Sequence, residues 1–173
     1  MIVEACVETY EGALKAEKNG ATQIELCSDL SNDGLTPPQE LIKKVHSDLK
    51  IPVKVMIRPR KGNLHYTLKD LVKMFKSIEY CKKIGVAGVV FGVLDSNNEL
   101  DIQAISEMAC IAFPLKVTIH KAIDLTPDPI ASVSKLVELN FIDSILSSGG
   151  RNTAEEGAPQ IKTMLDIAGH KIT

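Results

Sequence analysis

The sequence predicts an α/β fold in which parallel strands curl into a barrel-like sheet, and three observations favour this class. Six strand-like runs recur at intervals of roughly 28 residues, a spacing typical of repeated βα units. Each run is followed by a segment with helical periodicity. The runs end in reactive or anion-binding side chains, at the edge of a parallel sheet where such folds carry their chemistry.

The strands are recognised as short apolar or alternating segments, and the helices by Pro near their first turn and Gly or Asn beyond their last. The predicted strands are Ile2–Cys6, Gln23–Cys27, Val53–Ile57, Gly88–Leu94, Leu115–His120 and Ser144–Ser147, with a seventh beginning at Lys171–Thr173. The first predicted helix ends at Asn19-Gly20, the second begins at Pro37-Pro38, the third covers Leu68–Ile84 before Gly85, the fourth covers Asp101–Ala112, the fifth runs from Pro127 and Pro129 to Asn140, and the sixth begins near Thr153.

Six βα units and the start of a seventh strand fit a single domain over residues 1–173. A complete barrel of eight units typically takes about 250 residues. The sequence therefore predicts either a shorter open α/β sheet or an incomplete barrel that lacks its last quarter. No linker, low-complexity run or second domain interrupts the pattern.

Composition argues against several classes of partner. A formal net charge of −2 disfavours a general binder of nucleic acid or of anionic membranes, and the absence of Trp disfavours a base-stacking platform. The first residues enter a strand without the features of a signal peptide, and no apolar run is long enough to span a bilayer. We expect a cytoplasmic protein that binds neither nucleic acid nor membrane.

Alternation along the strands predicts that their two faces differ. One parity is apolar and comprises Val3, Ala5, Ile24, Leu26, Val53, Val55, Ile57, Leu115, Val117 and Ile119. The other parity is largely polar, and we expect it to face the barrel interior while the apolar set packs under the helices. Because buried charges need partners, Glu4, Glu25, Arg58 and His120 are expected to form one network, which is either structural or part of a functional site.

Cys6 and Cys27 end the first two strands with the same inward parity. Neighbouring parallel strands lie about 4.8 Å apart. Two thiolates at that separation could hold a soft ion such as Cu(I), with Met56 as a further sulfur ligand. The alternative is that these two residues, like Cys81 and Cys110, are small buried hydrophobic side chains.

Two segments are candidates for binding an anion. Arg58 and Arg60 are two residues apart at a strand end, so they point the same way and are placed to clamp a carboxylate or phosphate. The alternative for Arg58 is that it neutralises a carboxylate inside the barrel. Ser148-Gly149-Gly150 follows a strand and precedes a helix, where backbone N–H groups converge on anions.

A third segment is a candidate for acid/base chemistry. His120 ends a strand and Asp124 follows shortly after it, so His120 is a candidate general acid or base. Taken as an enzyme site, the strand ends combine an acid, a base and an anion clamp in Glu4, Glu25, Arg58, His120 and Asp124. A histidine in this setting is alternatively a structural residue.

Taken together, these segments resemble the CutC copper-homeostasis family. The matching stretches are Glu4–Cys6, Ala21–Cys27, Gly34–Pro37, Val55–Arg60, Gly88–Leu94, Val117–Asp124 and Leu146–Gly150. They occur in the order and at the spacing of the family over essentially the whole chain. One departure is Lys121, where the family usually has Arg.

The resemblance implies a TIM-barrel fold, a cytoplasmic location, homo-oligomers and a link to copper tolerance. It also implies that Cys6 and Cys27 bind Cu(I), and that family members continue through a seventh and an eighth strand beyond Thr173. The function expected first is therefore cytosolic copper handling through these two cysteines. The alternative is an enzyme that carries out acid/base chemistry on a small anionic or phosphorylated metabolite.

Overall fold

The computed structural model describes residues 2–173 and contains one sheet of six parallel strands. The strands are β1 (Glu4–Val7), β2 (Gln23–Leu26), β3 (Val53–Met56), β4 (Gly88–Phe91), β5 (Lys116–Ile119) and β6 (Ser144–Ile145). Each strand pairs with the next one along the chain, so the order in the sheet is the order in the sequence. This is the topology of successive βα units in a barrel, and it confirms the predicted class.

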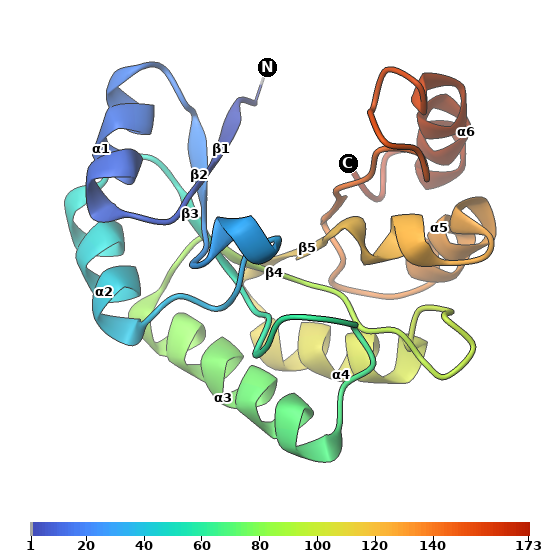
Figure 1. Ribbon diagram of the computed structural model, residues 1–173, viewed down its shortest axis with the longest axis horizontal. Helices are drawn as coiled ribbons and strands as arrows, with labels where there is room; N and C mark the ends of the chain where they lie inside the picture. Colours follow the sequence, from blue (N-terminus) through green and yellow to red (C-terminus); the bar gives the residue numbers. More distant parts are fainter. Residues whose placement is uncertain (1) are drawn as a thin grey trace.

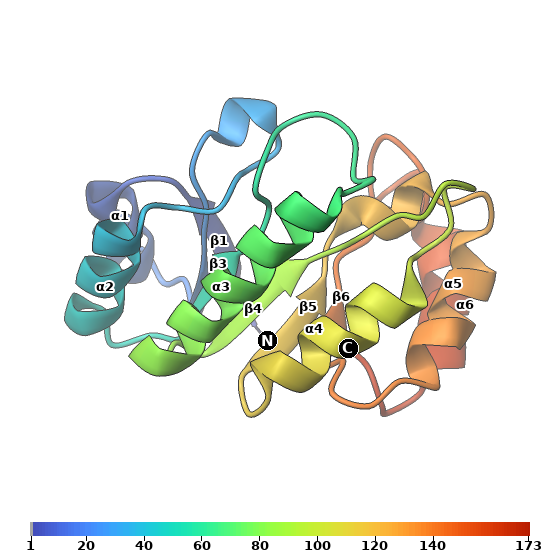
Figure 2. The same ribbon diagram turned by 90° about the horizontal axis from the view of Figure 1, so that it is seen from below.

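Helices separate the strands and lie along the outer side of the curved sheet (Figure 1 and Figure 2). They are α1 (Tyr10–Lys18), α2 (Gln39–Asp48), α3 (Leu68–Ile84), α4 (Ile102–Ala112), α5 (Pro129–Val137) and α6 (Ala158–Ala168), with short 3₁₀ helices η1 (Leu30–Asn32) and η2 (Lys121–Leu125) after β2 and β5. The six strands therefore form a half-barrel with an inner face and a helix-covered outer face. No helix in residues 2–173 is long and apolar enough to cross a membrane.

The two faces of the strands differ in the way the alternation predicts. The outward-facing residues Ile24, Leu26, Val55, Val117 and Ile119 are fully buried in the main hydrophobic core. Burying one such side chain contributes about 1.5–3 kcal/mol, and a shift of one residue would turn all of them inward. This layer therefore determines which polar side chains enter the barrel.

A polar layer crosses the lower part of the barrel interior. Lys54 on β3 lies 3.3 Å from a carboxylate oxygen of Glu4 on β1 and donates to Thr118 Oγ1 on β5 at 2.9 Å. To reach β5 it passes over Gly88 on β4, where an added Cβ would lie 3.2 Å from the Lys54 Cγ atom. Gln23 donates a further hydrogen bond to Glu4. Glu4 therefore has Lys54 as its ion-pair partner in this layer, and its participation in a network with Glu25, Arg58 and His120 stays a prediction.

Several element boundaries differ from the sequence prediction. Strand β1 begins two residues later than predicted, and α6 begins at Ala158 instead of near Thr153, because residues 151–157 form turns that end at Gly157. Lys171–Thr173 is not a strand of its own. Its last residue nevertheless pairs with β6, since the Thr173 N–H donates to the Asp143 carbonyl and its carbonyl accepts from the Ile145 N–H.

Candidate functional site

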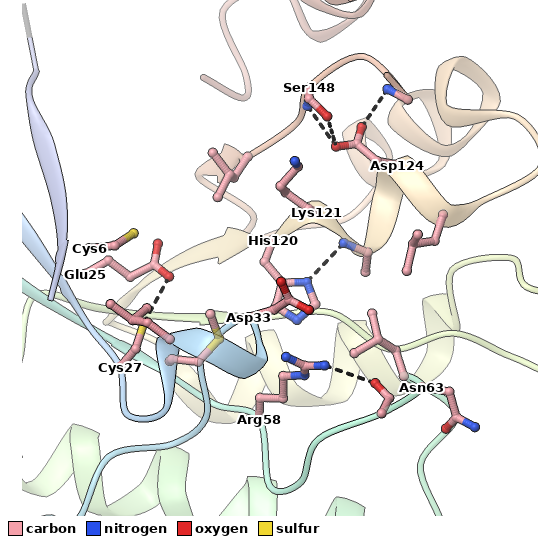
Figure 3. Close-up of a pocket in the computed structure, with 18 of the residues that line it drawn as sticks. Cys6, Glu25, Cys27, Asp33, Arg58, Asn63, His120, Lys121, Asp124 and Ser148 are labelled. Atoms are coloured by element: carbon pink, nitrogen blue, oxygen red, sulfur yellow. Dashed lines mark hydrogen bonds between the residues drawn. The ribbon is translucent and has the colours of Figure 1, made fainter. Parts of the chain in front are cut away.

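A cavity of about 650 Å³ lies at the C-terminal ends of the strands (Figure 3). Its walls come from β1, β2 and β3 and from the segments that follow β2, β3, β5 and β6. Among its lining residues are most of those singled out in the sequence, namely Cys6, Glu25, Cys27, Arg58, His120, Asp124, Ser148 and Gly150. Glu4, Arg60 and Gly149 are not among them. The half-barrel therefore gathers side chains that are far apart in sequence around one space.

Glu25 lies between Cys6 and Cys27, the two cysteines at the C-terminal ends of β1 and β2, which we call the rim cysteines (Figure 3). In the register of β1 and β2, Cys6 stands opposite Glu25, and Cys27 comes two residues after Glu25. The Cys27 thiol donates to Glu25 Oε1 at 3.5 Å, while Glu25 Oε2 is buried and has no partner among residues 2–173. Cys6 and Cys27 are therefore diagonal across the strands and separated by a carboxyl group. Cys27 is buried, as is Cys81, whereas Cys6 and Cys110 are exposed, so the prediction of simple buried cysteines is wrong for two of the four.

The surroundings of these groups favour their protonated forms. Partial burial, followed by the charges of Glu25 and Glu4, raises the pKa of the Cys6 thiol to about 12. Burial, followed by the charge of Glu25, also raises the pKa of Cys27. The pKa of Glu25 is raised by burial and by the negative charge of Glu4. At neutral pH both sulfur atoms therefore carry their protons.

Arg58 joins two loops at the side of the cavity. Its Nη1 donates to the carbonyls of Asn32 at 2.7 Å and Gly34 at 3.3 Å, and its Nη2 donates to the carbonyl of Gly62 at 3.0 Å. Its Nε atom is buried and finds no partner in the residues that the structure describes. Within residues 2–173 it makes no ion pair, so the expected pairing of Arg58 with Glu4 or Glu25 is wrong. The backbone carbonyls position the guanidinium and leave its charge uncompensated.

His120 follows β5, and one nitrogen of its imidazole ring accepts a hydrogen bond. The backbone N–H of Ala122 donates to Nδ1 at 3.1 Å, whereas Nε2 is buried and has no partner in the described part of the chain. The ring packs against Gly92, where an added Cβ would lie 2.6 Å from the His120 Cε1 atom. Burial, followed by the positive charge of Arg58, lowers the pKa of His120 to about 4. The side chain is therefore neutral at physiological pH.

Asp124 is not a partner of His120, because its carboxylate is bound by the loop that follows β6. It accepts hydrogen bonds from the Ser148 N–H at 2.8 Å, the Ser148 hydroxyl at 3.0 Å and the Gly150 N–H at 2.9 Å, and also from the Ser147 hydroxyl. The Gly149 N–H donates to the Ser147 hydroxyl. The predicted anion site at Ser148-Gly149-Gly150 is thus filled by the chain's own carboxylate.

Arg60 likewise has a local role. Its guanidinium donates to Asp70 Oδ2 at 3.1 Å and to the carbonyls of Asn63 at 3.0 Å and His65 at 2.6 Å. These bonds close the loop between β3 and α3 on itself. The prediction that Arg58 and Arg60 form one clamp is therefore wrong, because Pro59 and the loop direct the two guanidinium groups to different partners.

Sequence reasoning missed several residues that shape the cavity. Lys121 and Arg151 line it and add positive charge, and Asp33 adds negative charge. Gly92 makes room for the His120 ring. Lys121 and Gly92 had a detectable signal, since each directly follows a residue at a strand end. Asp33 and Arg151 lie on loops whose paths the sequence pattern does not specify.

Three sulfur-containing side chains near the cavity, those of Cys6, Cys27 and Met56, are possible metal ligands. Cys27 packs with Met56 and Val90 in a small buried cluster inside the barrel. Cys6 stands on the other side of Glu25. Throughout residues 2–173, no three side chains of His, Cys, Asp or Glu converge in the manner of a preformed metal site.

Comparison with known proteins identifies the family of this chain. The CutC family matches the sequence over residues 1–173. The chain belongs to the CutC family. The copper homeostasis protein cutC homolog of Homo sapiens is 39% identical over 171 residues, which cover 99% of this chain and 62% of the human protein. A CutC family protein of Histophilus somni is 38% identical over 172 residues and is covered to 70% of its length.

Solved structures agree with the half-barrel description. A putative copper homeostasis protein CutC from Streptococcus agalactiae has a TM-score of 0.92 and 32% identity, with 99% of this chain and 85% of that chain covered. Dihydrodipicolinate synthase DapA-2 from Bacillus anthracis has a TM-score of 0.67 at 15% identity, over 98% of this chain and 62% of that chain. This second likeness shows the fold alone, which is that of a TIM barrel. The chain spans about three fifths of the length of the human relative.

Proposed function

We propose that the cavity at the strand ends is the active site of an enzyme that carries out acid/base chemistry on a small anionic metabolite. One observation carries this proposal. Of the four buried polar side-chain atoms without a partner in residues 2–173, three belong to residues that line the cavity: Glu25 Oε2, Arg58 Nε and His120 Nε2. Leaving such an atom unpaired costs about 1–3 kcal/mol, so three around one cavity favour a polar ligand that pairs with them.

The charges around the cavity favour an anionic ligand. Arg58 has no carboxylate partner within residues 2–173, and Lys121 and Arg151 add two further cations to the wall. The exposed side chains of Leu30 and Leu125 also line the cavity, so a ligand with an apolar portion would find contacts there. A small carboxylate or phosphate with a short carbon skeleton matches this combination.

Glu25 is the residue proposed to move a proton. Its pKa is raised by burial and by Glu4, which makes it a better proton acceptor than an exposed carboxylate. Positive charge from Arg58 would stabilise the negative charge that develops on the substrate. Glu4 and Asp124 are given structural roles in this proposal. Glu4 pairs with Lys54, and Asp124 accepts hydrogen bonds from the loop after β6.

The test is a search for turnover that depends on Glu25. Purified protein would be incubated with defined mixtures of small carboxylates and phosphates, and their consumption followed by mass spectrometry. We expect one compound to be converted, and Glu25→Gln to abolish the conversion. Glu79→Gln, which changes an exposed glutamate on α3, is the matched control and should leave the conversion unchanged. Equal rates for both variants, or no conversion and no retained metabolite in native mass spectra, would contradict the proposal.

A second candidate function is the binding of Cu(I) as cargo at the two rim cysteines. It is suggested by the family's copper-homeostasis relatives and favoured by the position of Glu25 between Cys6 and Cys27. Two thiols and a nearby thioether, Met56, are donors that suit Cu(I). The negative charge of Glu25 and Glu4 would attract a cation, although burial and the same charge raise the pKa of both thiols and keep them protonated.

An anaerobic titration of Cu(I) against a coloured chelator tests this candidate. We expect one ion to bind per chain and the affinity to rise with pH, because binding must displace thiol protons. The double change Cys6→Ser with Cys27→Ser should remove this binding, and Cys81→Ser with Cys110→Ser should preserve it. Loss shared by both double variants would instead indicate unspecific thiol chemistry.

A further inference from the structure

We propose that His120 acts in this cavity as a fixed hydrogen-bond donor, which presents Nε2–H to a carbonyl, carboxylate or phosphate oxygen of the bound molecule. It is not the proton acceptor of the site. This inference rests on the proposed enzyme function and narrows the chemistry of its ligand. The observations that carry it are the hydrogen bond at Nδ1, the unpaired Nε2 and the packing of the ring.

The hydrogen bond at Nδ1 determines the tautomer. The Ala122 backbone N–H donates to Nδ1 at 3.1 Å. A ring nitrogen that accepts a hydrogen bond carries no hydrogen, so in the neutral imidazole the one hydrogen is on Nε2. Nε2 is buried, has no partner in the described chain, and belongs to a residue that lines the cavity. A donor is therefore left for a ligand.

Packing keeps the ring in this orientation. An added Cβ at Gly92 would lie 2.6 Å from Cε1 and 2.7 Å from Nδ1 of His120, so the Cε1–Nδ1 side of the ring lies against the segment after β4. Turning the ring over would place a carbon against the Ala122 N–H and lose its hydrogen bond. The backbone N–H of His120 is also held, since it donates to the Phe91 carbonyl at 3.0 Å.

Electrostatics keep the donor neutral. The uncompensated charge of Arg58 opposes a second positive charge on the ring, in the same direction as burial. The other charged residues that line the cavity are Glu25, Asp33, Lys121, Asp124 and Arg151. With the ring neutral and Nδ1 engaged, His120 has no free lone pair with which to accept a proton from a ligand. That role falls to the unpaired oxygen of Glu25.

The ligand group that fits is an oxygen with a free lone pair. A neutral imidazole donor can polarise a carbonyl without giving up its proton, and it can also hold a carboxylate or phosphate oxygen. An ammonium or another pure donor group would leave Nε2–H unpaired. The structure thus assigns the His120 side of the cavity to the acceptor end of the substrate.

The tautomer can be measured without knowing the substrate. Protein labelled with ¹⁵N in histidine would be examined by two-bond ¹H–¹⁵N correlation spectra across neutral pH, with His120→Asn used to assign the ring. We expect hydrogen on Nε2, none on Nδ1, and no change through the neutral range. Hydrogen on Nδ1, or on both nitrogens at neutral pH, would overturn the proposal.

The ligand role is tested with pyruvate, acetate and inorganic phosphate as probes in the same spectra. We expect at least one probe to shift the Nε2 signal saturably without changing the tautomer. His120→Gln retains a donor at about the reach of Nε2, whereas His120→Asn retains an acceptor near Nδ1 but its shorter side chain places no donor at the position of Nε2. Binding of that probe should therefore be roughly tenfold weaker in His120→Asn and closer to wild type in His120→Gln.

Two outcomes of these probe experiments count against the donor role. If no probe moves the Nε2 signal, or if the two variants weaken binding equally, His120 does not supply the donor. Turnover that depends on Glu25 with the opposite His120 tautomer would overturn this inference and leave the enzyme proposal standing. The expected tautomer and probe shifts without any turnover would support the donor role of His120 and contradict the enzyme proposal.

Discussion

At the scale of single residues, Gly92 is the position on which the geometry of His120 most directly depends. An added Cβ there would lie 2.6 Å from both the His120 ring and the Ala122 Cβ. Overpacking of this kind costs about 1–3 kcal/mol. We therefore expect Gly92→Ala to destabilise the protein by about that amount in urea unfolding, and to displace the His120 signals in ¹⁵N spectra.

The double change Gly92→Ala with Ala122→Gly separates the two contacts. It removes the clash with Ala122 and leaves the clash with the ring. We expect stability to recover in part while the His120 signals stay displaced. Unchanged stability and unchanged His120 signals in Gly92→Ala would show that the ring does not rest on this backbone.

The Asp124 carboxylate occupies the position in the loop after β6 that the sequence assigned to a bound anion. Burial alone would raise its pKa, but hydrogen bonds from Ser147, Ser148 and Gly150 outweigh that effect and lower it. Asp124→Asn turns one oxygen into a donor that faces other donors. We expect a loss of about 1–2 kcal/mol at neutral pH, a figure reduced for the partial exposure of the group.

The pH dependence of this loss identifies its cause. A carboxylate whose pKa is lowered by folding contributes stability above its unfolded pKa of about 3.9, and this contribution disappears as the pH falls below that value. The difference between wild type and Asp124→Asn in urea unfolding should therefore shrink in acid. A difference that is the same at neutral and acidic pH would point to packing instead.

At the scale of elements, the inner polar layer connects strands that are not neighbours. Lys54 reaches from β3 across β4 to β5 and also pairs with Glu4 on β1, and the two side chains are 12% and 22% exposed. Removing either charge alone leaves the other partly buried without its partner. We expect Lys54→Met and Glu4→Gln to be coupled by roughly 1 kcal/mol in a double-mutant cycle of urea unfolding. Additive effects would mean that the layer only fills space.

Elements with strong end signals were predictable, and those without them were not. Helix α3 was predicted with its observed bounds, and Gly85, which marked its end in the sequence, has a positive φ of 83° there. The structure adds a capping box of Thr67 and Asp70 at its start. Helix α6 has no side-chain cap, since Gly157 precedes it. Glu155 and Glu156, acidic residues typical of a first helical turn, favoured a start near Thr153, but the chain forms turns there. Local chemistry thus specifies a helix end where a capping side chain, a proline or a left-handed glycine marks it.

The sequence predicted which residues gather at the C-terminal ends of the strands, but it did not predict their hydrogen-bond partners. Strand parity correctly places Glu25, Cys27 and His120 on the inner side, because alternation is a property of the backbone. The hydrogen-bond partners depend on strand register and on loops, which parity does not determine. This is why Arg58 meets backbone carbonyls in place of a carboxylate, and why Asp124 meets the loop after β6 in place of His120.

At the scale of the whole molecule, buried titratable groups predict how stability depends on pH. His120 has a folded pKa of about 4 and an unfolded value of about 6.5, so the unfolded chain binds the additional proton between these values. Its contribution to stability is present above about pH 6.5 and is lost as the pH falls toward 4. Glu25 acts in the opposite direction, because its raised pKa favours the folded state in acid.

The thiols limit stability on the alkaline side. Burial raises the pKa of Cys81 to about 12, and the pKa of Cys27 is raised as well. A thiol in the unfolded chain ionises near pH 8.5, so the unfolded state loses its proton first and gains relative stability above that pH. Each fully buried group contributes a slope of up to about 1.4 kcal/mol per pH unit. Stability should therefore be highest between about pH 6.5 and 8.5.

Urea unfolding at a series of pH values, with matched variants, tests both the acid and the alkaline decline in stability. His120→Asn should flatten the decline below about pH 6.5, because the group that takes up a proton on unfolding is gone. Cys81→Ser should reduce the decline above about pH 8.5, whereas Cys110→Ser, at an exposed position, serves as its control. If His120→Asn kept the acid slope of the wild type, His120 would have to bind its proton equally well in the folded state. The lowered pKa of the folded ring would then be ruled out by stability data alone.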